Sequence, residues 1–77
     1  MLTVEEIERR VEHSRQTLVS LAELVVKDQR SRGDAYVWAQ AEHHTLASLL
    51  EEAPESEHAK IHDLLLRWEL MMASLVN

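Results

Sequence analysis

The fold of this chain is decided by residues 4–25, which read VEEIERRVEHSRQTLVSLAELV. Positions 4, 7, 11, 14, 18, 21 and 25 follow the alternating three- and four-residue spacing of a heptad seam. Six of these seven positions are apolar, and the exception is Ser14. Side chains at this spacing share one face of an α-helix. The stretch therefore predicts a long amphipathic helix that packs against other helices.

The first predicted helix has clear signals at both ends. Thr3 and Glu6 have the T-x-x-E spacing of a capping box, in which each side chain satisfies an unpaired backbone N–H. Neither Gly nor Pro interrupts the chain before Gly33, its only glycine. Because a left-handed glycine ends many helices, we expect Gly33 to follow a helix over about residues 4–32.

Two further helices are predicted after this glycine. A second apolar stripe favours a helix over about residues 35–53, with Asp34 as its N-cap. Pro54 ends that helix, because the residue before a proline avoids the α conformation. A third stripe predicts a helix over about residues 55–76. The short connections imply that neighbouring helices are antiparallel.

The size of the chain indicates one domain that needs support. A chain of 77 residues forms at most a single helical domain, residues 1–77, and domains this small have marginal stability. Without cysteine it has no disulfide to add stability, so oligomerisation is the expected aid. We therefore predict an all-α fold, an antiparallel helical hairpin plus a third helix. This three-helix bundle would be completed by dimerisation or by a partner.

Composition limits the partners and the location. The net charge is −6, and residues 34–77 hold eight acidic but only two basic residues, so nucleic acid is not an expected partner. No apolar run is long enough for a transmembrane helix, and residues 1–6 do not resemble a signal peptide. We expect no membrane partner and a cytoplasmic protein.

Arginines on the first helix could indicate a membrane surface, but acidic residues alternate with them. Arg9 and Arg10 lie four residues after Glu5 and Glu6, a spacing at which opposite charges pair on a helix. We therefore expect these four side chains to form a solvated face.

Uncovered apolar residues are the candidate protein-binding site. The first predicted helix is about 42 Å long and the second about 30 Å, so the start of the first should project beyond the second. On the third helix, two leucines lie on the face opposite the main stripe, beside residues that suit an adaptable interface. The expected protein-binding residues are Val4, Ile7, Val11, Leu66, Leu70, Trp68 and Met72. They predict a homodimer, or a partner helix from another protein.

Two polar residues interrupt the expected packing. Glu42 lies near the middle of the apolar stripe of the second helix, close to Trp38, and Arg15 lies off the seam of the first. Glu42 either reaches water past small neighbours or is a buried specificity contact to Arg or His of another chain. In the predicted register Arg15 lies nearer Glu51, so an Arg15–Glu42 pair would be intermolecular.

Histidine spacing suggests an alternative function. Glu55, His58 and His62 combine an E-x-x-H motif with an i,i+4 histidine pair, which are spacings that helical metal sites use. One such motif on the polar flank of a helix is too little for us to expect a metal or another cofactor. A metal-binding or pH-sensing bundle remains the alternative.

Catalytic motifs are lacking. With no Cys and one Gly, the sequence has no thiol nucleophile, P-loop or glycine-rich elbow. We therefore predict a small non-enzymatic protein–protein interaction module that acts as an adaptor, co-chaperone or inhibitory regulator through exposed apolar helix faces.

One segment resembles a known family. The tetrapeptide Arg32-Gly33-Asp34-Ala35 and the residues that follow it, Tyr36, Trp38, Gln40 and Leu46, resemble the small co-chaperones of type III secretion needle subunits. The resemblance covers residues 20–50. It implies a short helical hairpin that binds a larger helical-repeat chaperone. The predicted third helix departs from that family.

Overall fold

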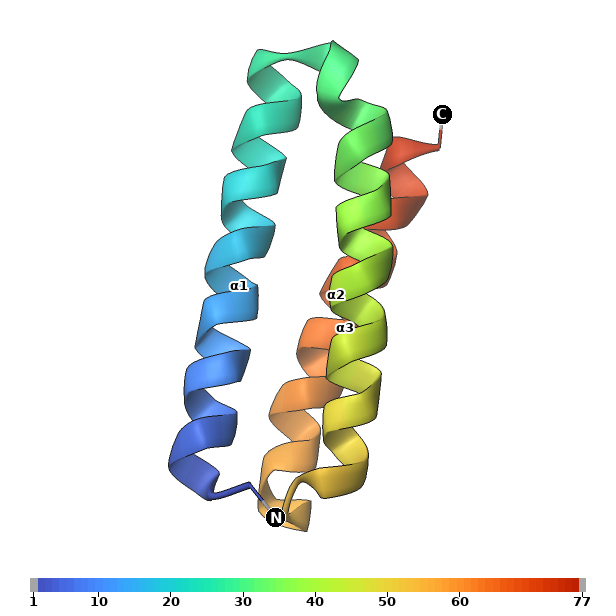
Figure 1. Cartoon of the computed structure of the whole chain (residues 1–77). Helices are drawn as coiled ribbons and strands as arrows, with labels where there is room; N and C mark the ends of the chain where they lie inside the picture. Colours follow the sequence, from blue (N-terminus) through green and yellow to red (C-terminus); the bar gives the residue numbers. More distant parts are fainter. Residues whose placement is uncertain (1, 77) are drawn as a thin grey trace.

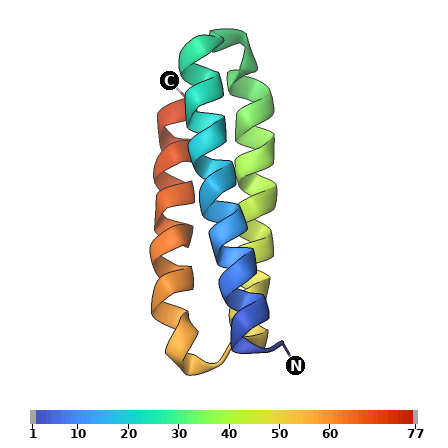
Figure 2. The same ribbon diagram turned by 90° about the vertical axis from the view of Figure 1, so that its left-hand side faces the viewer.

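The computed structural model describes residues 2–76 and folds that range into three α-helices joined by two 3₁₀ turns (Figure 1). The elements are α1 (Val4–Lys27), η1 (Gln29–Ser31), α2 (Arg32–Glu52), η2 (Glu55–Glu57) and α3 (His58–Leu75). The helices run up, down and up, and they form a rod of 39 × 17 × 15 Å (Figures 1 and 2). The predicted all-α class with three helices is confirmed.

The start of α1 confirms Thr3 as the N-cap, which is one half of the predicted capping box. The Oγ1 of Thr3 accepts a hydrogen bond of 3.1 Å from the backbone N–H of Glu6. The Thr3 hydroxyl also donates to Oε1 of Glu6, at 3.2 Å. Glu5 and Glu6 lie in the first turn, where the helix dipole favours negative charge.

The first corner lies five residues earlier than predicted. Helix α1 ends at Lys27, and Asp28 takes an extended conformation. The carboxylate of Asp28 accepts a 3.0 Å hydrogen bond from the backbone N–H of Arg30, and its carbonyl accepts from Ser31. A side-chain oxygen that accepts from the backbone two residues on is a common turn former. The short polar side chain of Asp28, not a left-handed glycine, therefore ends the helix.

Gly33 was assigned the wrong role. No glycine in residues 2–76 has a positive φ, and Gly33 lies in the first turn of α2, which begins at Arg32. Asp34 is consequently inside α2 and is not its N-cap; Ser31 holds that position.

The shift of this corner removes the predicted overhang. Helices α1 and α2 have 24 and 21 residues, so their lengths are about 36 and 31 Å. Their ends lie nearly level, and the start of α1 lies beside the corner between α2 and α3 (Figures 1 and 2).

The second corner forms close to the predicted place. Helix α2 ends at Glu52, and Ala53 is extended, as expected of the residue before Pro54. Helix α3 begins at His58 rather than at about residue 55, because residues 55–57 form the tighter turn η2. The imidazole Nε2 of His58 lies 3.0 Å from the carbonyl oxygen of Ala53 and ties this corner together.

A single hydrophobic core runs through the bundle. Its buried members come from all three helices: Ile7, Ala39, Leu46, Leu49, Ile61, Leu64, Leu65 and Trp68. Helices α2 and α3 share the most extensive contact, whereas α1 packs more loosely against both. This looser packing leaves a groove beside α1.

Two polar residues are buried in the structure. Ser14, the exception in the α1 seam, accepts a 3.0 Å hydrogen bond at Oγ from the indole Nε1 of Trp68. Glu57 is also buried, and its Oε1 has only the Lys60 ammonium, 3.7 Å away, as an ion-pair partner. Among the described helices, none combines the length and the apolar character that a membrane crossing needs.

Candidate functional site

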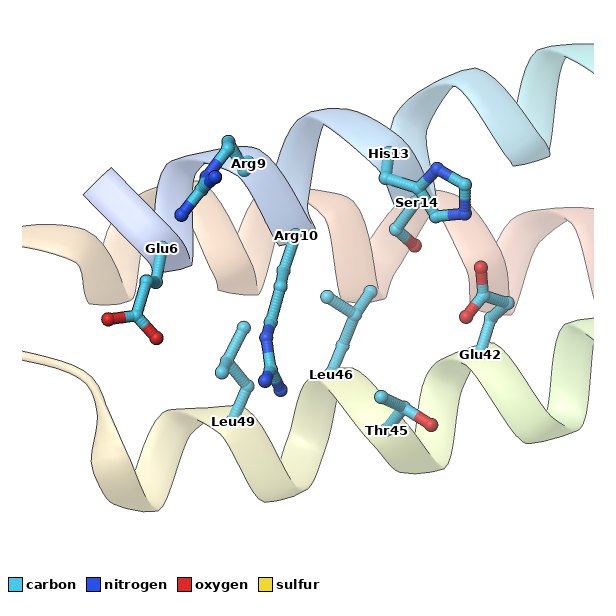
Figure 3. Close-up of a pocket in the computed structure, with 9 residues that line it drawn as sticks. All are labelled: Glu6, Arg9, Arg10, His13, Ser14, Glu42, Thr45, Leu46 and Leu49. Carbon is cyan, nitrogen blue, oxygen red and sulfur yellow. The ribbon is translucent and has the colours of Figure 1, made fainter. Parts of the chain in front are cut away.

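A groove with a volume of about 540 Å³ lies between α1 and α2. We call it the α1–α2 groove. Its lining residues are Glu6, Arg9, Arg10, His13, Ser14, Glu42, Thr45, Leu46 and Leu49 (Figure 3). Leu46 and Leu49 are buried core residues, so the groove has an apolar floor.

The groove continues along the bundle toward the first corner. Of two smaller depressions beside it, one shares Glu42 and Thr45 with the groove and the other shares His13. Both of these depressions reach Trp38, and one of them is also lined by Leu21 and Leu24. One continuous face of α1 and α2 therefore carries the groove at one end and an aromatic side chain at the other.

Trp38 is the most unusual residue on this face. Its surface is 56% exposed, and Leu24 on α1, which lines the same depression, is 46% exposed. Trp38 falls on the apolar stripe of the sequence, which favours core packing, but the structure leaves it exposed. The buried stripe is formed by Ala35, Ala39, Leu46 and Leu49, which directs Trp38 to the flank. The spacing of Ala35 and Ala39, four residues apart, is the feature of the sequence that could have indicated this buried stripe.

In the described part of the chain, the charged side chains along the groove form no ion pairs. Within residues 2–76, neither Arg9 nor Arg10 forms an ion pair, so the expected pairing with Glu5 and Glu6 is not present. The side chain of Arg10 instead extends from α1 toward Leu49 on α2 (Figure 3). Glu42 is half-buried on the opposite wall, and in the described range it too has no ion-pair partner.

The predicted overhang residues do not form one exposed surface. Ile7 is fully buried in the core, so its assignment to a protein-binding site was wrong. Val11 is half-buried against the core, and Val4 remains 40% exposed. Ile7 is covered because the earlier corner brings the start of α1 level with the end of α2.

The predicted residues of α3 also divide into two groups. Trp68 is fully buried and Met72 packs against the core, so Trp68 is a packing residue and not a surface anchor. Leu66 and Leu70 are 54% and 62% exposed, on the side of α3 away from the core. Charged side chains surround them, including the Arg67–Asp63 ion pair at 3.0 Å.

Arg15 is exposed and pairs within its own helix, so it is not a buried polar residue of the protomer, and its intermolecular contact with Glu42 stays a prediction. Its Nε donates a 3.0 Å hydrogen bond to Oε1 of Glu12. This hydrogen bond lowers the pKa of the Glu12 carboxyl and raises that of the Arg15 guanidinium. Arg15 also lines the opposite flank of α1, beside α3, and so it lies outside the α1–α2 groove.

Within residues 2–76, the side chains of the alternative metal site are not grouped together. In the part of the chain that the structure describes, no three His, Asp or Glu side chains are grouped so that they could hold a metal ion. His58 is committed to the carbonyl of Ala53, and His62 is exposed on α3. His43 instead bridges α2 and α3 through a 3.1 Å contact with Glu69.

Comparisons of this chain with protein-family models, with curated proteins and with solved structures find no match. The segment that resembles type III secretion co-chaperones also loses its central feature, because Gly33 lies inside α2 and does not form the hairpin break.

Proposed function

We propose that this chain is a small non-enzymatic interaction module that docks other protein surfaces through the α1–α2 groove. The observation that carries this proposal is Trp38, more than half exposed on the same face as an apolar-floored groove. Tryptophan is enriched among the residues that dominate protein–protein binding energy, because its large ring fills a partner's pocket. Removing this ring and Leu24 from water gives docking a favourable driving force.

Shape supports docking of another protein. Two antiparallel helices with a groove between them offer a partner helix a place to lay its apolar side. Leu46 and Leu49 provide the apolar floor, and unpaired charges stand on both walls. Such polar walls around an apolar centre are typical of specific interfaces.

The biological class we propose is that of an adaptor, co-chaperone or inhibitory regulator, which suits a module of 77 residues that binds without catalysis. A cytoplasmic location is compatible with the lack of cysteine. Leu66 and Leu70 form a second exposed apolar surface, but neither of them lines the α1–α2 groove or the two depressions beside it. The α1–α2 groove is therefore the better candidate for docking.

Affinity capture with matched variants tests the proposal. Tagged wild type, Trp38→Glu and the control Leu66→Glu are used as bait in host lysate, after circular dichroism has shown that all three are helical. The retained protein is then purified, and its affinity is measured by calorimetry. We expect Trp38→Glu to weaken binding by about a hundredfold, the effect of a hot-spot residue, and Leu66→Glu to change it little. Equal binding by wild type and Trp38→Glu, or no retained protein, would overturn the proposal.

A further inference from the structure

We infer that the occupant of the α1–α2 groove is a second copy of this chain, packed in the reversed direction across a twofold axis. In this dimer, Trp38 of each copy enters the end of the other copy's groove that is lined by Arg10 and Leu49. The inference rests on the proposed function, which makes this groove a docking surface, and it names the partner.

Self-complementary shape is the first argument. In a twofold dimer the same patch is used on both copies, so a projection and the cavity that receives it must lie on one face. Trp38 and Leu49 are eleven residues apart on α2, which is about 16 Å along the helix. When the second copy is reversed about a twofold axis midway between Trp38 and Leu49, each tryptophan lies over the other copy's cavity. A cavity of about 540 Å³ is in the range that holds whole drug-sized ligands, so an indole ring fits.

Self-complementary charge is the second argument. The same reversal brings Arg10 of one copy close to both Trp38 and Glu42 of the other, because Glu42 lies about one helical turn from Trp38. Arg10 and Glu42 have no ion-pair partners within residues 2–76. A guanidinium over an indole face gains a cation–π interaction, and the carboxylate gains an opposite charge.

Balanced charge at this face is the third argument. The chain carries −6, so two copies repel each other unless they meet where the charge is balanced. On the groove walls Arg9 and Arg10 offset Glu6 and Glu42 in number. A side of the rod measuring 39 by 17 Å has a projected area that approaches the roughly 800 Å² per partner of a standard interface.

The test is the mass of the pure protein in solution across a dilution series, measured by light scattering. We expect wild type to move from 8.9 kDa toward twice that value as concentration rises. Trp38→Ala, Glu42→Arg and Arg10→Glu should each weaken dimerisation by about tenfold or more. Arg67→Glu makes the same charge change as Arg10→Glu on α3, outside the groove, and should leave the dimer intact.

Mixing the charge variants gives the sharpest result. Glu42→Arg and Arg10→Glu each place like charges opposite one another in their own dimers. Together in one heterodimer they place opposite charges at both contacts, so an equimolar mixture of two monomeric variants should dimerise. This recovery also shows that each variant is folded.

Three outcomes overturn the inference: a wild type that is monomeric at every concentration, a dimer that survives Trp38→Ala and Glu42→Arg, and a dimer lost only in Leu66→Glu/Leu70→Glu. A monomer that still captures another protein through Trp38 refutes the second copy and leaves the proposed function standing. A dimer with the expected variant pattern but no captured protein supports the second copy as the occupant. It refutes the proposed docking of other proteins.

Discussion

The indole Nε1 of Trp68 donates a hydrogen bond of 3.0 Å to Oγ of Ser14, and both residues are buried where α1 meets α3. This contact explains the one polar position in the heptad seam of α1. A buried indole N–H that has no acceptor is costly, and a serine is small enough to accept its hydrogen bond inside a close helix contact. The serine therefore fixes the register of α1 against α3.

Replacing Ser14 by alanine should destabilise the fold by about 1–3 kcal/mol, because the Trp68 N–H would remain buried without an acceptor. Urea unfolding followed by circular dichroism measures this loss. Ser20→Ala on the exposed side of α1 is the control and should change the free energy of unfolding little. In the double variant Ser14→Ala/Trp68→Phe, the donor is absent as well, so the two effects should not add. Additive effects would contradict an energetic role for this hydrogen bond.

Helical periodicity predicted the class of the fold, while the Thr3 cap and Pro54 predicted the start of α1 and the end of α2. The seam of α1, the Thr3 cap and Pro54 act through neighbours within a few residues, so their effects are visible in sequence. The first corner differs from the prediction because Asp28, and not Gly33, ends α1. Asp28 forms the turn through a side-chain hydrogen bond to the backbone, and many aspartates on helix surfaces make no such bond.

The candidate site was harder to predict for the same reason. A shift of the corner by five residues moves α1 along α2, so it changes which residues share the groove. Arg15 was expected beside Glu51, whereas in the structure Arg10 lies beside Leu49 and the groove reaches Trp38. Which residues of α3 are exposed, by contrast, depends only on the phase of that helix. Leu66 and Leu70 were correctly expected to lie on the face away from the core.

The hydrogen bond from Arg15 should be visible in the titration of Glu12. It is the main cause that holds the pKa of the Glu12 carboxyl below its ordinary value. A pKa that is lower in the folded state adds stability above the unfolded pKa, and this is lost as pH falls through the folded pKa. Arg15→Ala should therefore raise the pKa of Glu12 in an NMR titration and make acid destabilisation shallower.

The control for this titration is Arg67→Ala, which breaks the equivalent Arg67–Asp63 pair on α3 and should leave Glu12 unchanged. Both pairs are exposed on helix surfaces, and only Arg15 contacts Glu12, so Arg67→Ala removes an exposed arginine without touching the titrating group. If Glu12 titrates identically in wild type and Arg15→Ala, the pair does not persist in solution.

Gly33→Ala should stabilise the protein by about 0.5–1 kcal/mol, since alanine restricts the unfolded chain where helical φ and ψ suit it. Gly33 lies in α2 without a positive φ, and an added Cβ meets no atom within 4 Å. Thermal unfolding measures the change as a higher Tm. A lower Tm would mean that Gly33 has the left-handed conformation that its sequence position first suggested.

Asp28→Ala should cost about 1 kcal/mol, the usual effect of removing an aspartate that caps a helix. The carboxylate accepts from the backbone N–H of Arg30 at 3.0 Å, and it also pairs with the Arg30 guanidinium at 3.2 Å. Arg30→Ala removes only the ion pair, and because that side chain is almost fully exposed, the free energy of unfolding should change by less than about 0.5 kcal/mol. Asp28→Asn keeps an acceptor for the backbone and should lie between the two. If Arg30→Ala costs as much as Asp28→Ala, then the ion pair rather than the backbone hydrogen bond holds the corner that sets the register of the groove.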